Sequence, residues 1–362
     1  MIIIIVYLIV LIGLSTYSYV LIDPNLTLIN ASWWRIFQDT FIQIGYYQRE
    51  LSWYLYLALV LLLFLFHFIF ISRSMKIASP FTLAILVSLI IVISYPFLSH
   101  DFFNYIFDAK IFTYYHQNPY LKTPLDFPRD EWLRFMHWVH RSYPYGPSFL
   151  VLTIIPSFLA FGKFILNFVF FKFLFIASYL IGVYYLQKID KRSALVFATH
   201  PLIIIEGLVN AHNDLIAVSL AVAGFYYLKE KKEWMGRLLL LLSGGIKYIT
   251  LPLLFLRKKK EHWLNRVAVF GVVLLIAYLS LFREIQPWYF LTLFIFLPIY
   301  PKFIDKLQIF IFGLLMSYYP FIRLGDWTNE RLLTKHWIII SSIILNLLYL
   351  LIYKRVYSLL KK

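Results

Sequence analysis

Long apolar runs constrain this chain more than any other feature. A helix needs ~20 mostly apolar residues to cross the hydrocarbon core of a bilayer, and runs near this length recur throughout the sequence. Since 61% of the residues are hydrophobic and only 14% are charged, the composition argues against a water-soluble fold. We therefore expect an all-α polytopic membrane protein with about ten transmembrane helices. The candidate spans are residues 2–22, 51–71, 80–98, 164–187, 194–209, 215–228, 262–282, 287–300, 303–322 and 335–353.

These spans are expected to pack as one bundle, so residues 1–362 would form a single domain. The first run, residues 2–22, has no basic segment before it and no obvious small-residue cleavage site after it. We interpret it as a retained first span, and a cleaved signal peptide is the alternative.

Basic residues gather at the ends of apolar runs, where they indicate orientation in a membrane and not nucleic-acid binding. The net charge is +16, and clusters occur at 229–232, 257–260 and 354–362. Since short cytoplasmic loops are rich in Lys and Arg, these clusters, with Arg73 and Lys76, predict a multi-pass protein of the cell membrane with both termini in the cytoplasm. The loops expected outside are 23–50, 99–147, 210–214, 283–286 and 323–334.

Two apolar segments do not fit this alternation. Residues 149–161 contain Pro156 and lie between an outside loop and a span that must enter from outside, so we interpret them as re-entrant or interfacial. Residues 237–256 have basic clusters on both sides and are interrupted by Ser-Gly-Gly at 243–245. This pattern predicts a helical hairpin with Lys247 near its tip, and one miscounted span is the alternative.

The stretch 99–147 is polar and aromatic-rich between two apolar regions. Asp101, Asn104, Tyr105 and Asp108 recur at helical spacing. The spacing places them on one face of a helix whose other face is aromatic and aliphatic. We therefore expect an amphipathic helix at a membrane surface, in an extracytoplasmic loop.

The second half of this stretch predicts another surface helix over residues 126–141. Asp126 is suited to cap it and Pro128 to its first turn. The sequence Tyr-Pro-Tyr-Gly-Pro at 143–147 then predicts a rigid turn, in which Gly146 permits close approach of another backbone. A simple junction between loop and helix is the alternative.

Asp101 stands where an apolar run meets water, within the first turn of the expected helix. One role for a carboxylate there is to complement the helix dipole and cap free amides. The other is to act as a general base that takes a proton from a hydroxyl group. Asp108, two turns along the same face, is a weaker partner, with surface solvation as its alternative role.

Further polar residues fall where outside turns are expected. His212, Asn213 and Asp214 suit a sugar, a phosphate or a metal-bound water, whereas a helix cap for the next span is the alternative. Lys247 lies inside an apolar stretch and requires an anionic partner, either Glu206 or a ligand phosphate. Snorkelling to the surface is the alternative for Lys247.

Trp288 and Tyr289 open a late span, where aromatic residues serve as membrane-interface anchors or as a sugar platform. The chain has no Cys, which excludes disulfides, zinc thiolate sites and a nucleophilic Cys. We expect no cofactor. A divalent metal is not supported, because only His212 and Asp214 offer ligands at close spacing.

Taken in order, these motifs resemble those of polyprenyl-phosphate-dependent membrane glycosyltransferases of the GT-C type, especially the prokaryotic alpha-mannosyltransferases of lipoglycan assembly. The matching motifs run from Asp101 to Tyr289. They are Asp101 with Tyr105; Asn118, Pro119 and Tyr120; Pro144, Tyr145, Gly146 and Pro147; Asn210, His212, Asn213 and Asp214; Lys247 with Tyr248; and Trp288 with Tyr289.

The resemblance implies inverting transfer of a hexose, mannose favoured, from a polyprenyl-phosphate sugar to a lipid-linked or glycan acceptor at the extracytoplasmic face. Asp101 matches the family's general base, so residues 99–147 would be the catalytic loop. Asp23 and Asp39, in the preceding outside loop, are rival bases. We discount both because no basic and glycine-rich context surrounds them.

In that scheme the leaving phosphate needs no general acid, but a cation must offset its developing charge. Lys247, Arg141 and His212 are the candidates, in that order. The expected substrate-binding residues are Tyr105, Asp108, Asn118, Tyr120, Arg141, Tyr145, His212, Asn213, Asp214, Lys247, Tyr248, Trp288 and Tyr289.

The alternative function is a polytopic transporter or lipid flippase. Transporters usually carry paired repeats with broken helices at matching positions of two halves. Here the polar residues gather at the outer loops, and no second copy of the stretch 99–147 is present in the sequence. A structural assembly subunit is a third class, and it would not need Asp101, Asp214 and Lys247 on one side. Glycosyl transfer is therefore favoured.

Overall fold

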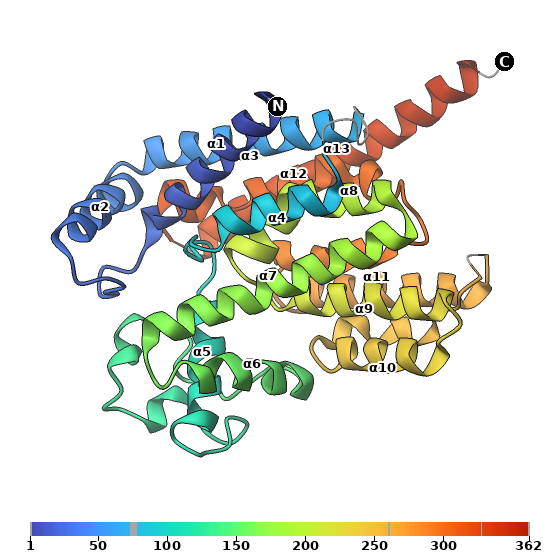
Figure 1. Ribbon diagram of the computed structural model, residues 1–362. Coiled ribbons are helices and arrows are strands. Elements are labelled where there is room, and N and C mark those ends of the chain that lie inside the picture. Colours follow the sequence, from blue (N-terminus) through green and yellow to red (C-terminus); the bar gives the residue numbers. More distant parts are fainter. Residues whose placement is uncertain (1, 73–77, 260, 327, 361–362) are drawn as a thin grey trace.

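The computed structural model describes residues 2–72, 78–259, 261–326 and 328–360, which form a bundle of helices (Figure 1). Within these ranges no β-strand occurs, and the all-α prediction is confirmed. The α-helices are α1 (Ile2–Tyr17), α2 (Ser32–Ile42), α3 (Arg49–Ser72), α4 (Pro80–Ile91), α5 (Asp101–Thr113), α6 (Pro147–Leu159), α7 (Phe164–Ile189), α8 (Lys191–Thr199), α9 (Asp214–Lys229), α10 (Glu233–Gly244), α11 (Trp263–Phe282), α12 (Gln308–Met316) and α13 (Asn329–Leu360).

Short 3₁₀ and π-helical segments connect these helices. The 3₁₀ segments are η1 (Ser18–Leu21), η3 (Pro124–Asp126), η4 (Glu131–Phe135), η6 (Tyr248–Phe255), η7 (Pro287–Phe296) and η8 (Ile304–Leu307). The π-helical segments are η2 (Gln43–Tyr47), η5 (Ile203–Val209) and η9 (Pro320–Leu324).

Six helical segments in the described ranges are long and apolar enough to cross a membrane, and a bent pair formed by α8 and η5 would make a seventh. The expected count of about ten is not confirmed. Three of the predicted spans contain α4, α9 and η7, which have 12, 16 and 10 residues. At ~1.5 Å per residue, an α-helix of 16 residues or fewer is shorter than the hydrocarbon core of ~30 Å. The six segments are Ile2–Leu21, Arg49–Ser72, Phe164–Ile189, Trp263–Phe282, Ile304–Leu324 and Asn329–Tyr353.

The predicted span 194–209 is not one straight helix. Helix α8 ends at Thr199, and η5 continues after a bend of 66°. His200 precedes Pro201 and has an extended backbone, since the residue before a proline is disfavoured in the helical region. After the bend every residue of η5, including Glu206, is buried.

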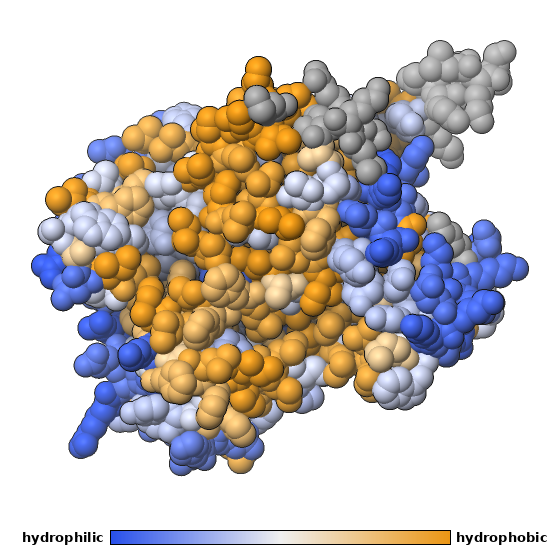
Figure 2. Space-filling model, in the orientation of Figure 1, coloured by the Kyte–Doolittle hydropathy of each residue, from blue (hydrophilic) through white to orange (hydrophobic). Residues whose placement is uncertain are grey.

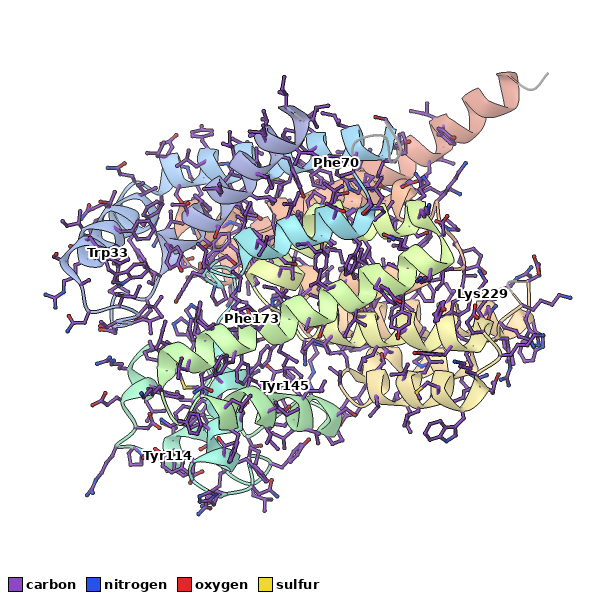
Figure 3. All side chains as sticks on the ribbon, viewed as in Figure 1. Trp33, Phe70, Tyr114, Tyr145, Phe173 and Lys229 are labelled. Carbon is purple, nitrogen blue, oxygen red and sulfur yellow. The ribbon has the colours of Figure 1, made fainter. Side chains whose placement is uncertain are left out.

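The outer surface is apolar in the middle and polar at both ends. Figure 2 shows a broad apolar band over the long helices, with hydrophilic residues at the left and right of the view. Figure 3 places Trp33 at one of these ends and Lys229 at the other. This distribution is typical of a bundle that spans a membrane. The positions of Arg73 and Lys76 and the side chains of the cluster 354–362 lie outside the described residues.

Helix α5 is buried, so the predicted surface helix is wrong. Every side chain from Phe102 to Ile111 is buried, including Asn104 and Asp108. The chain that follows α5 folds over its polar face, where the Asn104 amide donates to the Trp138 carbonyl at 3.0 Å. The aromatic face packs on α7, so the amphipathic pattern reflects two kinds of protein contact and not a boundary with water.

The second predicted surface helix, residues 126–141, is also wrong. Only the short segments η3 and η4 form there. Asp126 is the last residue of η3 because its carboxylate reaches back to accept the Thr123 N–H at 2.7 Å. Phe135 packs against Phe164 of α7 at 4.8 Å and not against lipid. The segment is therefore a compact loop held by aromatic contacts.

The two segments that broke the predicted alternation behave as short elements. Helix α6 has 13 residues, too few to cross a membrane, and packs against α5 and α7. The hairpin predicted at 237–256 is confirmed, since α10 and η6 are joined by a short turn. Arg237 donates to the Leu254 carbonyl at 2.6 Å, and Arg257 lies 3.6 Å from Glu233. The two outer ends of the hairpin therefore meet, and Lys247 lies at its tip.

Candidate active site

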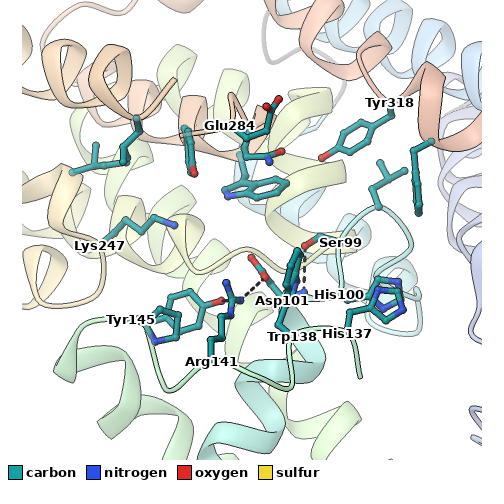
Figure 4. Close-up of a pocket in the computed structure, with 18 of the residues that line it drawn as sticks. Ser99, His100, Asp101, His137, Trp138, Arg141, Tyr145, Lys247, Glu284 and Tyr318 are labelled. Carbon is teal, nitrogen blue, oxygen red and sulfur yellow. Dashed lines mark hydrogen bonds and ion pairs between the residues drawn. The ribbon is translucent and has the colours of Figure 1, made fainter. Parts of the chain in front are cut away.

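A cavity of about 1220 Å³ lies where distant parts of the chain converge (Figure 4). One wall contains Asp101 and the segment 137–146. The facing walls come from the hairpin tip at 246–249, from α11 and from the start of α13. A concave site with a few converging polar groups on apolar walls is a typical ligand site. The predicted site residues on its walls are Asp101, Arg141, Tyr145, Lys247, Tyr248, Trp288 and Tyr289.

Asp101 is the first residue of α5, and its carboxylate faces the cavity. Its Oδ1 accepts a hydrogen bond from Arg141 Nη2 at 3.1 Å, and its Oδ2 lies 3.9 Å from His212 Nδ1. In the described part of the chain no backbone amide donates to this carboxylate. The contacts of this carboxylate are therefore to Arg141 and His212, and not to the backbone amides that a helix cap would hold.

Arg141 joins Asp101 to the aromatic lining of the cavity. Its Nη2 also donates to the Tyr145 hydroxyl at 3.2 Å, and its guanidinium lies 5.2 Å from the centre of the Trp138 ring. About a third of the Arg141 side chain remains exposed, at 34%. A guanidinium held in this way keeps donors available for an anionic ligand.

The turn that contains Tyr145 docks on the hairpin through two glycines. A Cβ on Gly146 would lie 2.0 Å from the carbonyl oxygen of Gly245, so only glycine fits. Ser148 N–H donates to the same carbonyl at 3.0 Å. The close approach predicted at Gly146 is confirmed. It brings the wall with Arg141 next to the hairpin tip with Lys247.

Lys247 is paired with Asp214 in the structure. Its Nζ lies 2.8 Å from Asp214 Oδ2 and 3.3 Å from Asn213 Oδ1. Glu206, which the sequence offered as a partner, instead contacts Asn210 and His212. Asp214 is 1% exposed and Lys247 is 17% exposed, so the ammonium group presents one side to the cavity.

His212 lies directly behind the cavity wall. Its imidazole is 1% exposed and stacks on the Trp288 ring at 4.0 Å and 15°. The Nε2 atom lies 3.4 Å from Glu206 Oε2, and the Nδ1 atom faces Asp101. Trp288 therefore separates the imidazole from the cavity, and His212 reaches the cavity through Asp101.

Five hydrogen bonds fix the turn that carries His212. Asn210 accepts the Leu98 N–H at 3.1 Å and donates to Glu206 at 3.2 Å, which ties this turn to the chain before α5. Lys172 donates to the last two carbonyls of η5, at 3.0 Å and 2.7 Å. Ala211 has a left-handed backbone with φ of 55°. This kink turns the chain so that His212 N–H bonds back to the Glu206 carbonyl at 3.1 Å.

Other predicted binding residues lie outside the cavity wall. Tyr105 is buried behind Tyr145, at 4.9 Å between ring centres. Asn118 accepts the Tyr120 N–H at 2.9 Å, and the Tyr120 hydroxyl donates to the Tyr145 carbonyl at 3.2 Å. The structure thus brings these side chains against the turn at 143–147 and not into the cavity.

Asp108 is buried within α5, 2% exposed. Burial raises the pKa of its carboxyl group from 3.8 to about 8, although Arg141 opposes the rise. Among the described residues no hydrogen bond or ion pair reaches it. The group is therefore mostly protonated at neutral pH.

The C-terminal third supplies a polar wall that sequence reasoning missed. Lys335 Nζ lies 3.1 Å from Glu284 Oε1 and 3.2 Å from Gln286 Oε1. All three line the cavity, with Glu284 above it in Figure 4. Lys335 is 2% exposed. Lys335 opens the last predicted span, but Arg331 and His336 stand close to it, so no isolated cation marked this wall in the sequence.

The rival bases do not line the cavity. Asp23 accepts the Asn25 N–H at 2.8 Å in a local turn, and Asp39 belongs to α2. Among the described residues no three His, Asp or Glu side chains are grouped as metal ligands. The cavity wall presents carboxylates, cations and aromatic rings.

Comparison with known proteins identifies one family. The model of the MptA_B family, described as alpha-(1->6)-mannopyranosyltransferase, N-terminal domain, matches residues 9–258. No curated protein and no solved structure matches the chain. The matched range includes Asp101, Arg141, His212, Asp214 and Lys247. The polar wall at Glu284 and Lys335 lies beyond it.

Proposed function

This chain belongs to the alpha-(1->6)-mannopyranosyltransferase family, and on that premise we propose that it transfers a hexose, mannose favoured, from a polyprenyl-phosphate sugar to a lipid-linked or glycan acceptor. The observation that carries the proposal is that Asp101 and Lys247, a carboxylate and a cation from distant parts of the matched range, face one cavity. Glycosyl transfer from a phosphate needs both groups.

Asp101 is the proposed general base. The acceptor oxygen attacks the anomeric carbon with inversion, the bond from that carbon to the phosphate oxygen breaks, and the acceptor proton passes to Asp101. The Arg141 guanidinium holds Oδ1 at 3.1 Å. This contact orients the carboxylate and leaves its second oxygen available for the proton.

Lys247 and Arg141 are the proposed contacts of the donor phosphate. As the sugar departs, the phosphate gains negative charge, and cations placed beforehand lower the barrier. Lys247 comes from the hairpin tip and Arg141 from the wall that docks beside it, and both line the cavity, so we assign the phosphate to both. Asp214 holds Lys247 in place and prevents the side chain from snorkelling away.

The apolar wall suits the polyprenyl chain. Leu275, Tyr278 and Leu279 of α11 line the cavity, and only 22% of the apolar window of α11 is buried within the protein. One helix thus faces both the cavity and the surrounding lipid. A donor whose phosphate lies at Lys247 would extend its chain along α11 into the bilayer.

The test is transfer by the full chain in lipid vesicles supplied with polyprenyl-phosphate mannose and membrane lipid acceptors. We expect Asp101→Asn to lower turnover about a hundredfold or more, since general base catalysis contributes ~10²–10⁴. Asp23→Asn, outside the cavity, is the matched control and should retain activity. Full turnover by Asp101→Asn would remove Asp101 as the base.

The proposed face of the membrane can be tested because the chain has no Cys. Asn118→Cys lies at the end with the catalytic loop, and Glu230→Cys lies beside Lys229 at the other. In intact cells an impermeant thiol reagent should label only the variant at 118. Labelling of the variant at 230 instead would place the active site in the cytoplasm.

A further inference from the structure

Glu206 is a carboxylate that the proposed mechanism does not use. It is 0% exposed and lies within η5, inside the bent span. A charge buried in a membrane bundle costs several kcal/mol unless it is paired, and such residues are usually functional. Its neighbours are the Asn210 amide at 3.2 Å, His212 Nε2 at 3.4 Å and the Tyr318 side chain.

His212 connects this buried carboxylate to the cavity. Its two ring nitrogens point in opposite directions, Nε2 toward Glu206 at 3.4 Å and Nδ1 toward Asp101 at 3.9 Å. Both nitrogens are buried, and neither forms a hydrogen bond within the ranges that the structure describes. Stacking on Trp288 fixes the plane of the ring. Glu206, His212 and Asp101 therefore lie in a line that ends at the cavity.

We propose that Asp101, His212 and Glu206 form a proton relay, in which His212 receives the acceptor's proton from Asp101 and Glu206 is the positioning residue that orients and stabilises the imidazolium. The proposal rests on the function proposed above. Asp101 first takes the proton as the acceptor O–H bond breaks. The proton then moves from Asp101 to Nδ1, which leaves Asp101 ionised and His212 positively charged between two carboxylates.

The direction of this transfer follows from ordinary acidities. A carboxyl group ordinarily ionises near pH ~3.9 and an imidazolium near pH ~6.5, so imidazole is the stronger base of these two group types. The Trp288 ring face adds a favourable contact for the cation. The separation of 3.9 Å is long for direct transfer, but contacts of this kind shorten when substrate binds.

The charged groups around His212 are compatible with this assignment. From α5 the imidazole faces Asp101, and from η5 it faces Glu206. Of the nearby cations, Arg141 binds Asp101 itself, Lys247 binds Asp214, and Lys172 donates to the last two carbonyls of η5. The imidazolium thus meets two acids, and each of these three cations is already bound to another group.

The first test measures the ionisation of His212 and does not depend on transfer. The chain has nine His residues, so nitrogen NMR of protein labelled on histidine, compared with His212→Gln, assigns the signal. Glu206→Gln keeps the size of the side chain but removes its charge. We expect the protonated fraction of His212 at a fixed pH to fall in Glu206→Gln, since a carboxylate favours the charged imidazole. An unchanged protonated fraction of His212 would overturn the role of Glu206.

The second test measures turnover. Glu206→Gln should lower kcat about tenfold to a hundredfold with little change in the donor KM, as expected for a residue that acts through its neighbour. The acidic limb of the kcat profile should move to lower pH, because protonated His212 cannot accept the proton. Glu261→Gln, on an exposed Glu away from the cavity, is the control and should match the wild type.

The two proposals fail in different ways. If the wild-type protein gives no transfer from polyprenyl-phosphate mannose, the proposed donor is refuted. If Glu206→Gln still changes the ionisation of His212 in that case, the contact between Glu206 and His212 stands. A loss of kcat in Glu206→Gln with an unmoved acidic limb would show that Glu206 only supports the fold, and would overturn the relay.

Discussion

Replacing Asp108 with Asn should change how the stability of the protein depends on pH. Burial raises the pKa of this carboxyl group from 3.8 in the unfolded chain to about 8 in the folded protein. The stabilisation from this group is therefore fully present below pH 3.8 and is lost as the pH rises toward 8. Each pH unit within that window costs about 1.4 kcal/mol of unfolding free energy. Between about pH 5 and pH 7 the loss is about 3 kcal/mol.

The assay is guanidinium unfolding in detergent micelles, followed by tryptophan fluorescence at several pH values. The difference between Asp108→Asn and the wild type should grow in favour of the variant by about 1.4 kcal/mol per pH unit. Asp126→Asn is the control, since the Thr123 amide holds the pKa of Asp126 below its usual value and its difference should be flat over this range. A difference for Asp108→Asn that does not change with pH would refute the reasoning.

Substitutions at three further positions test the contacts and the backbone turn that shape the cavity. Gly146→Ala places a Cβ against the Gly245 carbonyl and should cost about 1–3 kcal/mol of unfolding free energy, with reduced transfer; wild-type stability would contradict the contact. Lys247→Met leaves Asp214 unpaired and should lower kcat about tenfold or more and raise the donor KM, with partial recovery in Lys247→Arg; an unchanged KM would argue against a phosphate contact. Ala211→Gly relieves a backbone with φ of 55° and should stabilise by up to about 1 kcal/mol, whereas Ala211→Val should destabilise; the reverse order in unfolding experiments would contradict strain at this turn.

The parts of the site that the sequence predicted depend on local rules. The hairpin around Lys247 followed from basic residues at both of its ends, because positive charge tends to stay on one side of a membrane. The docking of Gly146 followed from two prolines and a glycine, whose backbone preferences are intrinsic. Lys247 required an anion, and one was found, although Asp214 and not Glu206 supplies it.

Sequence reasoning missed those features that depend on whether water, lipid or protein surrounds a side chain. The spacing of Asp101, Asn104 and Asp108 gives one polar face whether the cover is water or protein, so the pattern does not reveal that α5 is buried. The same limit explains the span count, since a short helix inside the bundle is as apolar as one that crosses the membrane. Only the tertiary contacts separate these cases.

One local hydrogen bond and two long-range arrangements account for the remaining errors. Asp126 was suited to begin a helix, but its carboxylate bonds to Thr123 and ends η3 instead. Glu206 and His212 are close in sequence, yet their alignment with Asp101 depends on the bend after Thr199. The wall at Lys335 comes from the last helix, and nothing local connects it to residues more than two hundred positions earlier.

The hairpin of α10 and η6 has a consequence for how such a chain can change in evolution. Its outer ends meet at Glu233 and Arg257, so the chain enters and leaves it at the same end of the bundle. Adding or deleting a unit of this kind does not reverse the direction of any later helix. Lys247 therefore lies on a unit that can change in length without forcing the helices after it to invert their direction across the membrane.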